Sequence, residues 1–385
     1  MDYKKLLEYC VTEEQTKVIK GMSQGVKQAD LARELGKTDR QVRVIRDTVK
    51  AIAASHGYAP GHFDQGTAPG FNMGKVTVQR GQDGEIERTW ERQLPDDAAR
   101  QEAIEATIAA MKEEIPPARK IAAPKKQTKN NLLNFYTLTD FHLGMLAWDE
   151  ETGANWDLNI AENMMVDAFA YLIDNTPDAE VGFFNEMGDF EHYDSHIAVT
   201  PTNSHILDAD GRPTKMIRAS IRVQRRVIEM MARKYKKVIV LNAEGNHNII
   251  SSVWKREAFA ELYRNNPRVE VITDVLPYYA YQWGKNMLGI HHGHLKRMAG
   301  LTDVFVSNYR EMYGATELLH IHTGHQHHRE LKETATAITE MHPTLAAPDA
   351  YSARGGWNSQ RAMQTITYHK DFFEVGRVMV RPNML

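Results

Sequence analysis

The sequence has one cysteine, no long apolar run and no strong excess of either charge. Because Cys10 stands alone among 385 residues, an intramolecular disulfide and a thiolate-based zinc site are both excluded. No apolar stretch approaches the roughly 20 residues that span a bilayer, and Met1 to Lys5 lack the apolar segment of a secretory signal. We therefore expect a cytoplasmic protein without a membrane partner, in which nitrogen and oxygen hold any metal.

Five short groups of potential metal ligands are present instead, and each directly follows an apolar run. The runs, such as 132–138 and 181–184, are typical of buried parallel strands. Open α/β sheets bind ligands at the carboxyl ends of such strands, so the groups are expected to meet there. Their members are Asp140 and His142, Asp189, Asn246 and His247, His292, and His325 and His327. The pattern predicts a metal centre with nitrogen and oxygen ligands.

The same part of the chain alternates between strand-like and helix-like segments. Apolar runs at 132–138, 181–184, 238–241, 287–290 and 318–321 are separated by amphipathic stretches at 159–174, 214–235, 254–265 and 301–313. Alternating residues at 365–380 predict paired strands near the end. This order is that of a layered α/β domain, which we place at residues 131–385.

Charge balance in the predicted centre favours a phosphate ester as the substrate. Two carboxylates, Asp140 and Asp189, leave a surplus of positive charge if two divalent ions bind. That surplus would attract a phosphate ester and lower the pKa of a water between the ions, so that hydroxide is available for in-line attack at phosphorus. The ligand set suits two divalent ions, Mn²⁺ first, with Fe, Zn or Ni as alternatives.

The order Asp-x-His, Gly-Asp, Gly-Asn-His, His-Gly, Gly-His-x-His resembles the calcineurin-like metallophosphoesterases over roughly residues 131–330. The resemblance implies an α/β sandwich, with two sheets between helices. It implies that His247 stabilises the transition state or protonates the leaving oxygen. It also implies two metal sites that share Asp189, one completed by Asp140, His142 and His327 and the other by Asn246, His292 and His325.

Two positions depart from the pattern of that family. The residue after His247 is usually an acid that orients the histidine ring, whereas this chain has Asn248. We expect the neutral amide of Asn248 to hold the ring but to stabilise its cationic form less well. The third residue after Asp189, often an acid or an amide, is His192.

Several further residues are candidates for contact with the substrate. The long polar segment 191–214 follows Asp189, and a loop of this length beside a metal site is often a lid or a substrate contact. An irregular surface loop is the alternative, and a structural turn is the alternative for the residues around Gly355-Gly356. His320, His322 and His328 are expected to be structural or exposed. The candidates are His192, His196, His205, His294, Arg354 and Trp357.

Residues 12–54 predict three helices separated at Gly25 and Gly36. Thr38 to Gln41 form a capping box that opens the third helix. On that helix, one face carries apolar residues, while the other carries Arg40, Arg43, Arg46 and Lys50 at helical spacing. Alternating residues on either side of Asp83-Gly84 predict a hairpin.

Three helices followed by a hairpin resemble the winged helix-turn-helix module of DNA-binding proteins, which would place the basic helix in a major groove. A small bundle for self-association or protein contacts is the alternative. We assign residues 1–95 to this module and 96–130 to an alanine-rich helix (96–114) and a basic, proline-containing linker (116–130). Residues 1–130 carry a slight positive excess and the remainder a slight negative one, which fits this division.

Together these features predict a dinuclear-metal-dependent phosphodiesterase that acts on DNA as a nuclease. The layout is similar to that of phosphoesterases encoded by bacteriophages, which would place the protein in the host cytoplasm. One alternative is a phosphatase or a phosphodiesterase for small or cyclic nucleotides. A second is a DNA-binding regulator with a non-catalytic metal domain, and assembly into a homo-oligomer is open in each case.

Overall fold

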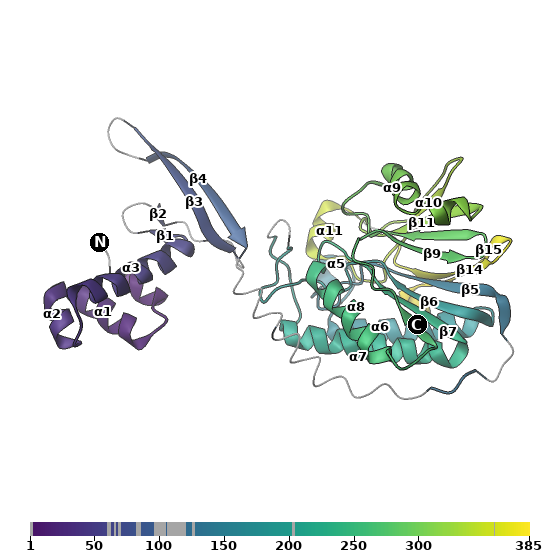
Figure 1. The fold of residues 1–385 in the computed structure, drawn as a ribbon, viewed down its shortest axis with the longest axis horizontal. Helices are drawn as coiled ribbons and strands as arrows, with labels where there is room; N and C mark the ends of the chain where they lie inside the picture. Colours follow the sequence, from purple (N-terminus) through teal and green to yellow (C-terminus); the bar gives the residue numbers. More distant parts are fainter. Residues whose placement is uncertain are drawn as a thin grey trace. The chain divides into compact units, whose positions relative to one another are not determined.

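The computed structural model describes residues 3–59, 63–64, 67, 71–81, 86–95, 105, 121–124, 128–201, 205–357 and 359–385. The chain divides into two compact units, Met1–Ala99 and Arg100–Leu385, whose elements are labelled in Figure 1. The predicted helix at 96–114 lies outside the described residues apart from position 105, and so does most of the linker at 116–130. Among the helices that the structure describes, none is both long and apolar enough to cross a bilayer.

The first unit begins with helices packed around small apolar clusters. A short 3₁₀ helix, η1 (Lys5–Tyr9), precedes α1 (Glu13–Ser23), α2 (Gln28–Glu34) and α3 (Asp39–Ser55). The predicted capping box is confirmed, since Thr38 Oγ1 accepts from Gln41 N and the Gln41 side chain accepts from Thr38 N. Val42 and Val49 of α3 are fully buried. The predicted inner face of the third helix therefore exists.

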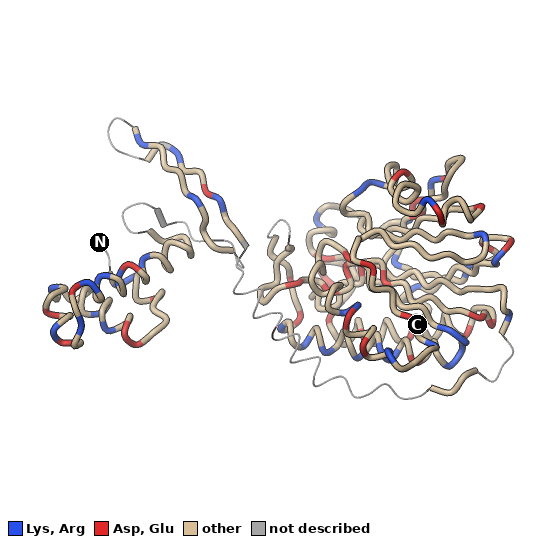
Figure 2. Tube along the Cα trace, in the orientation of Figure 1, with Lys and Arg blue, Asp and Glu red and all other residues tan. Residues whose placement is uncertain are grey.

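A two-stranded antiparallel ribbon follows the helices of the first unit. A minimal pair, β1 (Tyr58–Ala59) and β2 (Phe63–Asp64), precedes the longer strands β3 (Phe71–Arg80) and β4 (Ile86–Pro95). The predicted strand pairing is confirmed for the described residues, whereas the predicted turn at Asp83-Gly84 lies outside them. Lys and Arg occur along α1–α3 and on both long strands (Figure 2).

The second unit contains two sheets. The six-stranded sheet has the order β15-β14-β5-β6-β7-β8, and its strands β5 to β8 are parallel. The five-stranded sheet has the order β12-β13-β11-β10-β9, with β10, β11 and β13 parallel. The bounds are β5 (Lys129–Leu138), β6 (Ala179–Glu186), β7 (Lys237–Asn242), β8 (Val269–Val271), β9 (Tyr279–Trp283), β10 (Asn286–Ile290), β11 (Leu318–Thr323), β12 (Glu330–Glu333), β13 (Ile338–Met341), β14 (Met363–His369) and β15 (Phe373–Val380).

Helices cover the outer faces of both sheets. Strand β5 shows why: Leu133 and Phe135 pack between the sheets, whereas Tyr136 and Leu138 face the helices of the larger sheet. The helices are α5 (Asp149–Thr152), α6 (Leu158–Asn175), α7 (Pro213–Lys234), α8 (Ile249–Tyr263), η2 (Met298–Gly300), α9 (Leu301–Asn308), α10 (Arg310–Gly314), α11 (Ala350–Gly355) and η3 (Pro382–Met384). The unit is a mixed α/β sandwich with two sheets flanked by helices, as Figure 1 shows.

Several element boundaries differ from the sequence-based predictions. Helix α8 begins at Ile249, five residues before the predicted start, and the stretch predicted as one helix at 301–313 is divided into α9 and α10 around Tyr309. Strand β5 begins at Lys129, so the end of the predicted linker is part of the sheet. Ile121 packs against the core, and its carbonyl accepts from Arg268 Nη1 at 2.8 Å.

A buried hydrogen-bond network joins the two sheets. His322 contacts His342 (Nδ1 to Nε2, 2.9 Å), and its Nε2 lies 3.0 Å from the hydroxyl of Tyr368. The same hydroxyl lies 2.8 Å from His320 Nδ1, and the network continues to the carboxylate of Glu340. The expected structural role of His320 and His322 fits this arrangement, because both rings are buried and three of their four nitrogens have hydrogen-bond partners.

Candidate metal centre

The predicted ligands lie directly after the parallel strands of both sheets. Asp140 follows β5, Asp189 follows β6 and Asn246 follows β7, all in the larger sheet. His292 and His325 follow β10 and β11 of the smaller sheet. Since both sheets present these carboxyl ends together, Asp140 and His325, which are 185 positions apart in the chain, come into contact.

The backbone at these positions is unusual. Six described residues other than glycine have positive φ, and five of them are predicted ligands: Asp140 (50°), His142 (47°), Asp189 (54°), His325 (77°) and His327 (55°). Such a conformation costs on the order of 1–3 kcal/mol for a residue with a side chain and clusters at functional sites. The local structure is therefore organised to direct these side chains inward rather than to minimise backbone strain.

Two glycines permit the close approach of the loops. A Cβ atom on Gly245 would lie 2.1 Å from Asp189 Oδ1, and one on Gly324 would lie 2.5 Å from Asp140 Oδ2. Both contacts are far inside van der Waals distance, so neither position accepts a side chain without moving a predicted ligand. The glycines of the Gly-Asn-His and Gly-His-x-His patterns are therefore required for steric reasons, in addition to the chemical role of the ligands that follow them.

The donor atoms form two adjacent groups. In one, Asp140 Oδ1 lies 3.2 Å from His327 Nε2, which in turn lies 3.3 Å from His142 Nε2. In the other, Asp189 Oδ2 lies 3.0 Å from His292 Nε2, and His325 completes the group. Within each group all donor atoms are within 4.8 Å of one another. Asp140 Oδ1 is also 3.7 Å from His292 Nε2, so this carboxylate lies close to both groups.

Three buried donor atoms support a cation at this place. Asp140 Oδ1, Asn246 Oδ1 and His292 Nε2 have no partner in hydrogen-bond geometry, even though neighbouring rings and carboxylates are near in space. A buried polar atom without a partner is costly, and such atoms in a native structure require an explanation. Divalent cations coordinated by nitrogen and oxygen would satisfy Asp140 Oδ1 and His292 Nε2, which are 3.7 Å apart, and Asn246 lines the same cavity, so the residues fit the metals expected from the sequence.

Hydrogen bonds behind the donors fix their orientation. The Nδ1 of His292 contacts the carbonyl of Met187 at 2.9 Å, which leaves Nε2 directed into the site. The second oxygen of Asp140 accepts from Thr139 Oγ1 (2.6 Å) and from His325 N (2.8 Å). Each of these two ligands therefore presents one defined atom to the centre.

The carboxylates of Asp140 and Asp189 favour a positive charge between them. Burial by itself opposes ionisation of Asp140, but the rings of His327 and His292 lower its pKa well below the ordinary value. Burial likewise opposes protonation of His292, yet Asp189 and Asp140 raise its pKa to about 9. Protons on the imidazoles thus balance the carboxylates, and a bound cation would replace them, so that binding releases protons.

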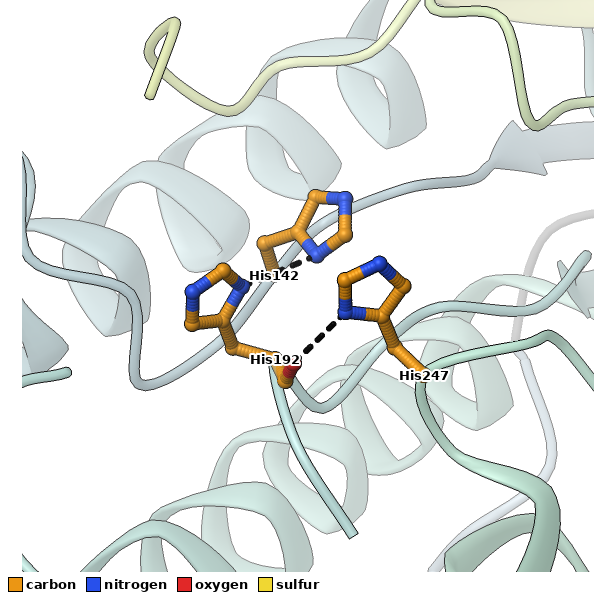
Figure 3. Close-up of side chains that lie close together, drawn as sticks. All are labelled: His142, His192 and His247. Carbon is orange, nitrogen blue, oxygen red and sulfur yellow. Dashed lines mark hydrogen bonds between the residues drawn. The ribbon is translucent and has the colours of Figure 1, made fainter. Parts of the chain in front are cut away.

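His142, His192 and His247 form a compact trio at the edge of the centre (Figure 3). The Nδ1 of His192 lies 3.2 Å from that of His142, and the rings of His192 and His247 are stacked at 5.7 Å. Burial, followed by the charge of His247, lowers the pKa of His192 to about 3, which makes this ring neutral at physiological pH.

The expectation that Asn248 holds the His247 ring is wrong. The ring is held by a backbone group, since His247 Nδ1 contacts the carbonyl of His192 at 2.7 Å (Figure 3). Asn248 instead accepts from the backbone N–H groups of Asp189 (3.1 Å) and Gly245 (3.0 Å) through its Oδ1. It thereby ties together two of the loops that carry predicted ligands.

A buried charge network lies behind the loop of Asp189. Lys255 Nζ is 3.3 Å from Glu186 and 2.9 Å from Glu191, and all three side chains have no exposed surface. Glu186 accepts from Gly188 N (2.6 Å), and Glu191 accepts from Asn248 Nδ2 (3.2 Å). This network was not predicted from the sequence.

A cavity of about 930 Å³ opens beside the two donor groups. Among the predicted substrate contacts, His192, His205 and Trp357 line it. His196 is not one of the lining residues. His294 lies instead against Glu244 (3.8 Å), and Arg354 pairs at the surface with Glu151 (3.0 Å). Arg361, which was not predicted from the sequence, lines the cavity.

Comparison with known proteins gives only weak likenesses. No protein-family model matches the chain, and no curated protein matches it. Three of the similar solved structures each match 65% of this chain. They are an archaeal phosphodiesterase (12% identity, 99% of that chain, TM-score 0.33), Vacuolar Protein Sorting 29 from Cryptosporidium parvum (12% identity, 96% of that chain, TM-score 0.31) and a conserved protein from Streptococcus pneumoniae described as a predicted phosphoesterase (8% identity, 97% of that chain, TM-score 0.27). These values assign no family to the chain.

Proposed function

We propose that the protein is a metal-dependent phosphoric ester hydrolase, and specifically a phosphodiesterase that cleaves DNA. The observation that carries the proposal is the pair of donor groups beside a cavity, together with the buried and unpartnered atoms Asp140 Oδ1, Asn246 Oδ1 and His292 Nε2. Asp140, His142 and His327 would hold one divalent ion, and Asn246, His292 and His325 the other, with Asp189 shared. When bound, the two ions would neutralise the phosphate and make a water acidic enough to supply the nucleophile.

His247 is the residue proposed to transfer a proton to the leaving oxygen. Its Nδ1 is engaged with the carbonyl of His192, so Nε2 is the nitrogen that remains for this exchange. His247 also lines the cavity. A carbonyl partner holds the ring in place in both its neutral and its cationic state, because Nδ1 keeps its proton in each.

Substitution of Asp189 tests the proposed chemistry. Asp189→Ala is expected to lower cleavage of bis(p-nitrophenyl) phosphate with Mn²⁺ by roughly a thousandfold or more, since a shared ligand positions both ions. Bound metal per chain, measured by elemental analysis, should fall as well. Asp371→Ala, at an exposed position outside the site, is the control. Cleavage that survives in Asp189→Ala would refute the centre.

A comparison of substrates tests the assignment to diesters. The same preparation is offered a phosphomonoester, a diester, single-stranded DNA and duplex DNA, each with Mn²⁺. We expect the diester and DNA to be cleaved faster than the monoester. Much faster release from the monoester would instead favour a phosphatase, and binding of metal without any cleavage would favour a DNA-binding regulator.

We further propose that the first unit binds DNA through α3, as a winged helix-turn-helix module does. Arg40 and Arg43 are exposed, while Arg46 and Lys50 are partly exposed on the same helix. Arg46 also pairs with Asp47 at 2.7 Å, so it is less available to bind a phosphate than Arg40 and Arg43. A cationic helix surface is what contact with phosphates requires.

Salt-dependent binding tests the role of α3. Replacing both Arg40 and Arg43 by Ala should weaken DNA binding and reduce the slope of log affinity against log salt by about one for each phosphate that the variant no longer neutralises. Arg33→Ala on α2, where the side chain already pairs with Asp30, is the matched control. Unchanged affinity in the double variant would favour the alternative, a module for protein contacts or self-association.

A further inference from the structure

The residues that line the cavity include an exposed pair of aromatic side chains. Tyr351 and Trp357 are 71% and 57% exposed, their ring centroids lie 5.1 Å apart, and both line the cavity. Trp357 is brought back toward α11 because Gly356 adopts a left-handed conformation (φ 72°) and Trp357 N donates to Ser352 O at 3.0 Å. Hydrogen bonds of the main chain thus hold the pair at the cavity.

Apolar side chains also line the cavity. Ile206, Leu207, Ala346, Ala347 and Pro348 line it together with His142, Asp189 and His247. Ile206 is 76% exposed, so it offers apolar surface to a ligand rather than to the core. A cavity lined by both polar donors and aromatic surface is suited to a ligand with a flat ring and a charged group.

The charges around the cavity limit how many phosphates it can hold. Of the described residues that line it, Arg361 is the single Lys or Arg, whereas Asp189, Asp208 and Asp349 supply carboxylates. The guanidinium of Arg361 is itself tied to the carbonyl of Leu345, through Nε at 2.9 Å and Nη2 at 2.6 Å. A long track of phosphates would need a row of cations, so the cavity itself offers cationic contact to the phosphate of one nucleotide and not to a row of phosphates.

We propose that Tyr351 and Trp357 form a base-stacking subsite, which holds the nucleobase of the nucleotide whose phosphate lies at the donor groups. The inference rests on the proposed phosphodiesterase function and specifies its substrate as a nucleoside-bearing ester. Stacking on an aromatic ring depends little on which base is present, because every base has a π face. The subsite therefore selects nucleosides over other alcohols without selecting a sequence.

Two diesters with the same leaving group test the subsite. The full-length protein with Mn²⁺ is given thymidine 5′-(p-nitrophenyl phosphate) and ethyl p-nitrophenyl phosphate. We expect a KM at least tenfold lower for the thymidine ester. Trp357→Ala should raise the KM for that ester by about 5-fold to 150-fold, the range of one stacked base, with a smaller change in kcat. Trp357→Phe should retain most of the preference.

The control is Trp148→Ala, which removes a tryptophan that is 59% exposed and does not line the cavity. Equal KM values for the two esters in the unsubstituted protein, or a thymidine preference that persists in Trp357→Ala and Tyr351→Ala, would overturn the subsite. Failure to cleave either ester would count against the proposed function alone. Calorimetric titration would then still test the subsite, which requires tighter binding of thymidine 5′-monophosphate than of ribose 5-phosphate.

Discussion

Lys255→Met is the substitution that most directly tests the buried network behind the Asp189 loop. The lysine lies between two carboxylates, Glu186 and Glu191, and none of the three side chains has exposed surface. Methionine has a similar length and shape but no charge, so the change removes the pairing and leaves the packing nearly intact. Two buried carboxylates would then be without their counter-ion.

The magnitude follows from the distances. At an effective dielectric constant of about 20, attraction across gaps near 3 Å amounts to roughly 5 kcal/mol for each pair. Loss of the lysine also removes its own cost of burial, which offsets part of this attraction. Breaking a buried pair by removing one partner generally costs about 3–5 kcal/mol. We expect the free energy of unfolding to fall by that amount.

The assay is equilibrium unfolding in urea, followed by circular dichroism. Lys285→Met is the control, because it removes an exposed pair with Glu317 (2.7 Å) and should change the unfolding free energy far less. Adding Glu191→Gln to Lys255→Met should restore part of the stability, since one unpaired carboxylate is then neutral. If Lys255→Met alone is as stable as the unsubstituted protein, the reasoning is refuted.

The pH dependence of Lys255→Met provides a second check. Burial raises the pKa of Glu186 to about 7 even though Lys255 opposes the shift, so loss of the lysine should raise this pKa further. A carboxyl group whose folded pKa exceeds its unfolded value destabilises the fold above the folded pKa, and the cost disappears as pH falls toward the unfolded value. The destabilisation should therefore be smaller at pH 5.5 than at pH 8.

Two further outcomes are expected. Gly245→Ala should reduce both the bound metal per chain and diester cleavage, because the new Cβ would lie 2.1 Å from Asp189 Oδ1. Gly314→Ala is the control and should change neither quantity, because a Cβ there meets nothing within 4 Å. Equal losses in the two variants would contradict the steric argument. Burial lowers the pKa of His342 to about 3, so this ring stabilises the fold fully above its unfolded pKa near 6.5 and progressively less as pH falls toward 3. The free energy of unfolding should therefore decrease less steeply between pH 7 and pH 4.5 in His342→Gln, by up to about 1.4 kcal/mol per pH unit. An unchanged slope would show that His342 is not held neutral.

Local chemistry in the sequence was sufficient to predict much of the fold. The apolar runs that became β5, β6, β7, β10 and β11 are buried on both faces, and such strands are recognisable as continuous apolar stretches. The capping box at Thr38 was also predictable, because its partners are three residues apart. Strand β12 was not, since all four of its residues are exposed and carry no apolar pattern.

The candidate site also has parts that were predictable from the sequence and parts that were not. The residue types and their order indicated which side chains are suited to metal binding. The partners that orient them were not predictable from residue identity. His247 is held by a backbone carbonyl, which every residue possesses, and Asn248 contacts Asp189, 59 positions away. The residues around Lys255 in the sequence gave no indication of which carboxylates it would meet.

Which segments are strands and which donor atoms follow them could be read from the amino-acid order, because both depend on residues that are close in the chain. The folded protein was needed to show that Asp140 Oδ1 lies near both donor groups, that Lys255 pairs with Glu186 and Glu191, and that Trp357 and Arg361 rather than Arg354 line the cavity. These contacts join side chains whose separation is fixed by the packing of two sheets and their helices, and distance along the chain carries no information about that packing.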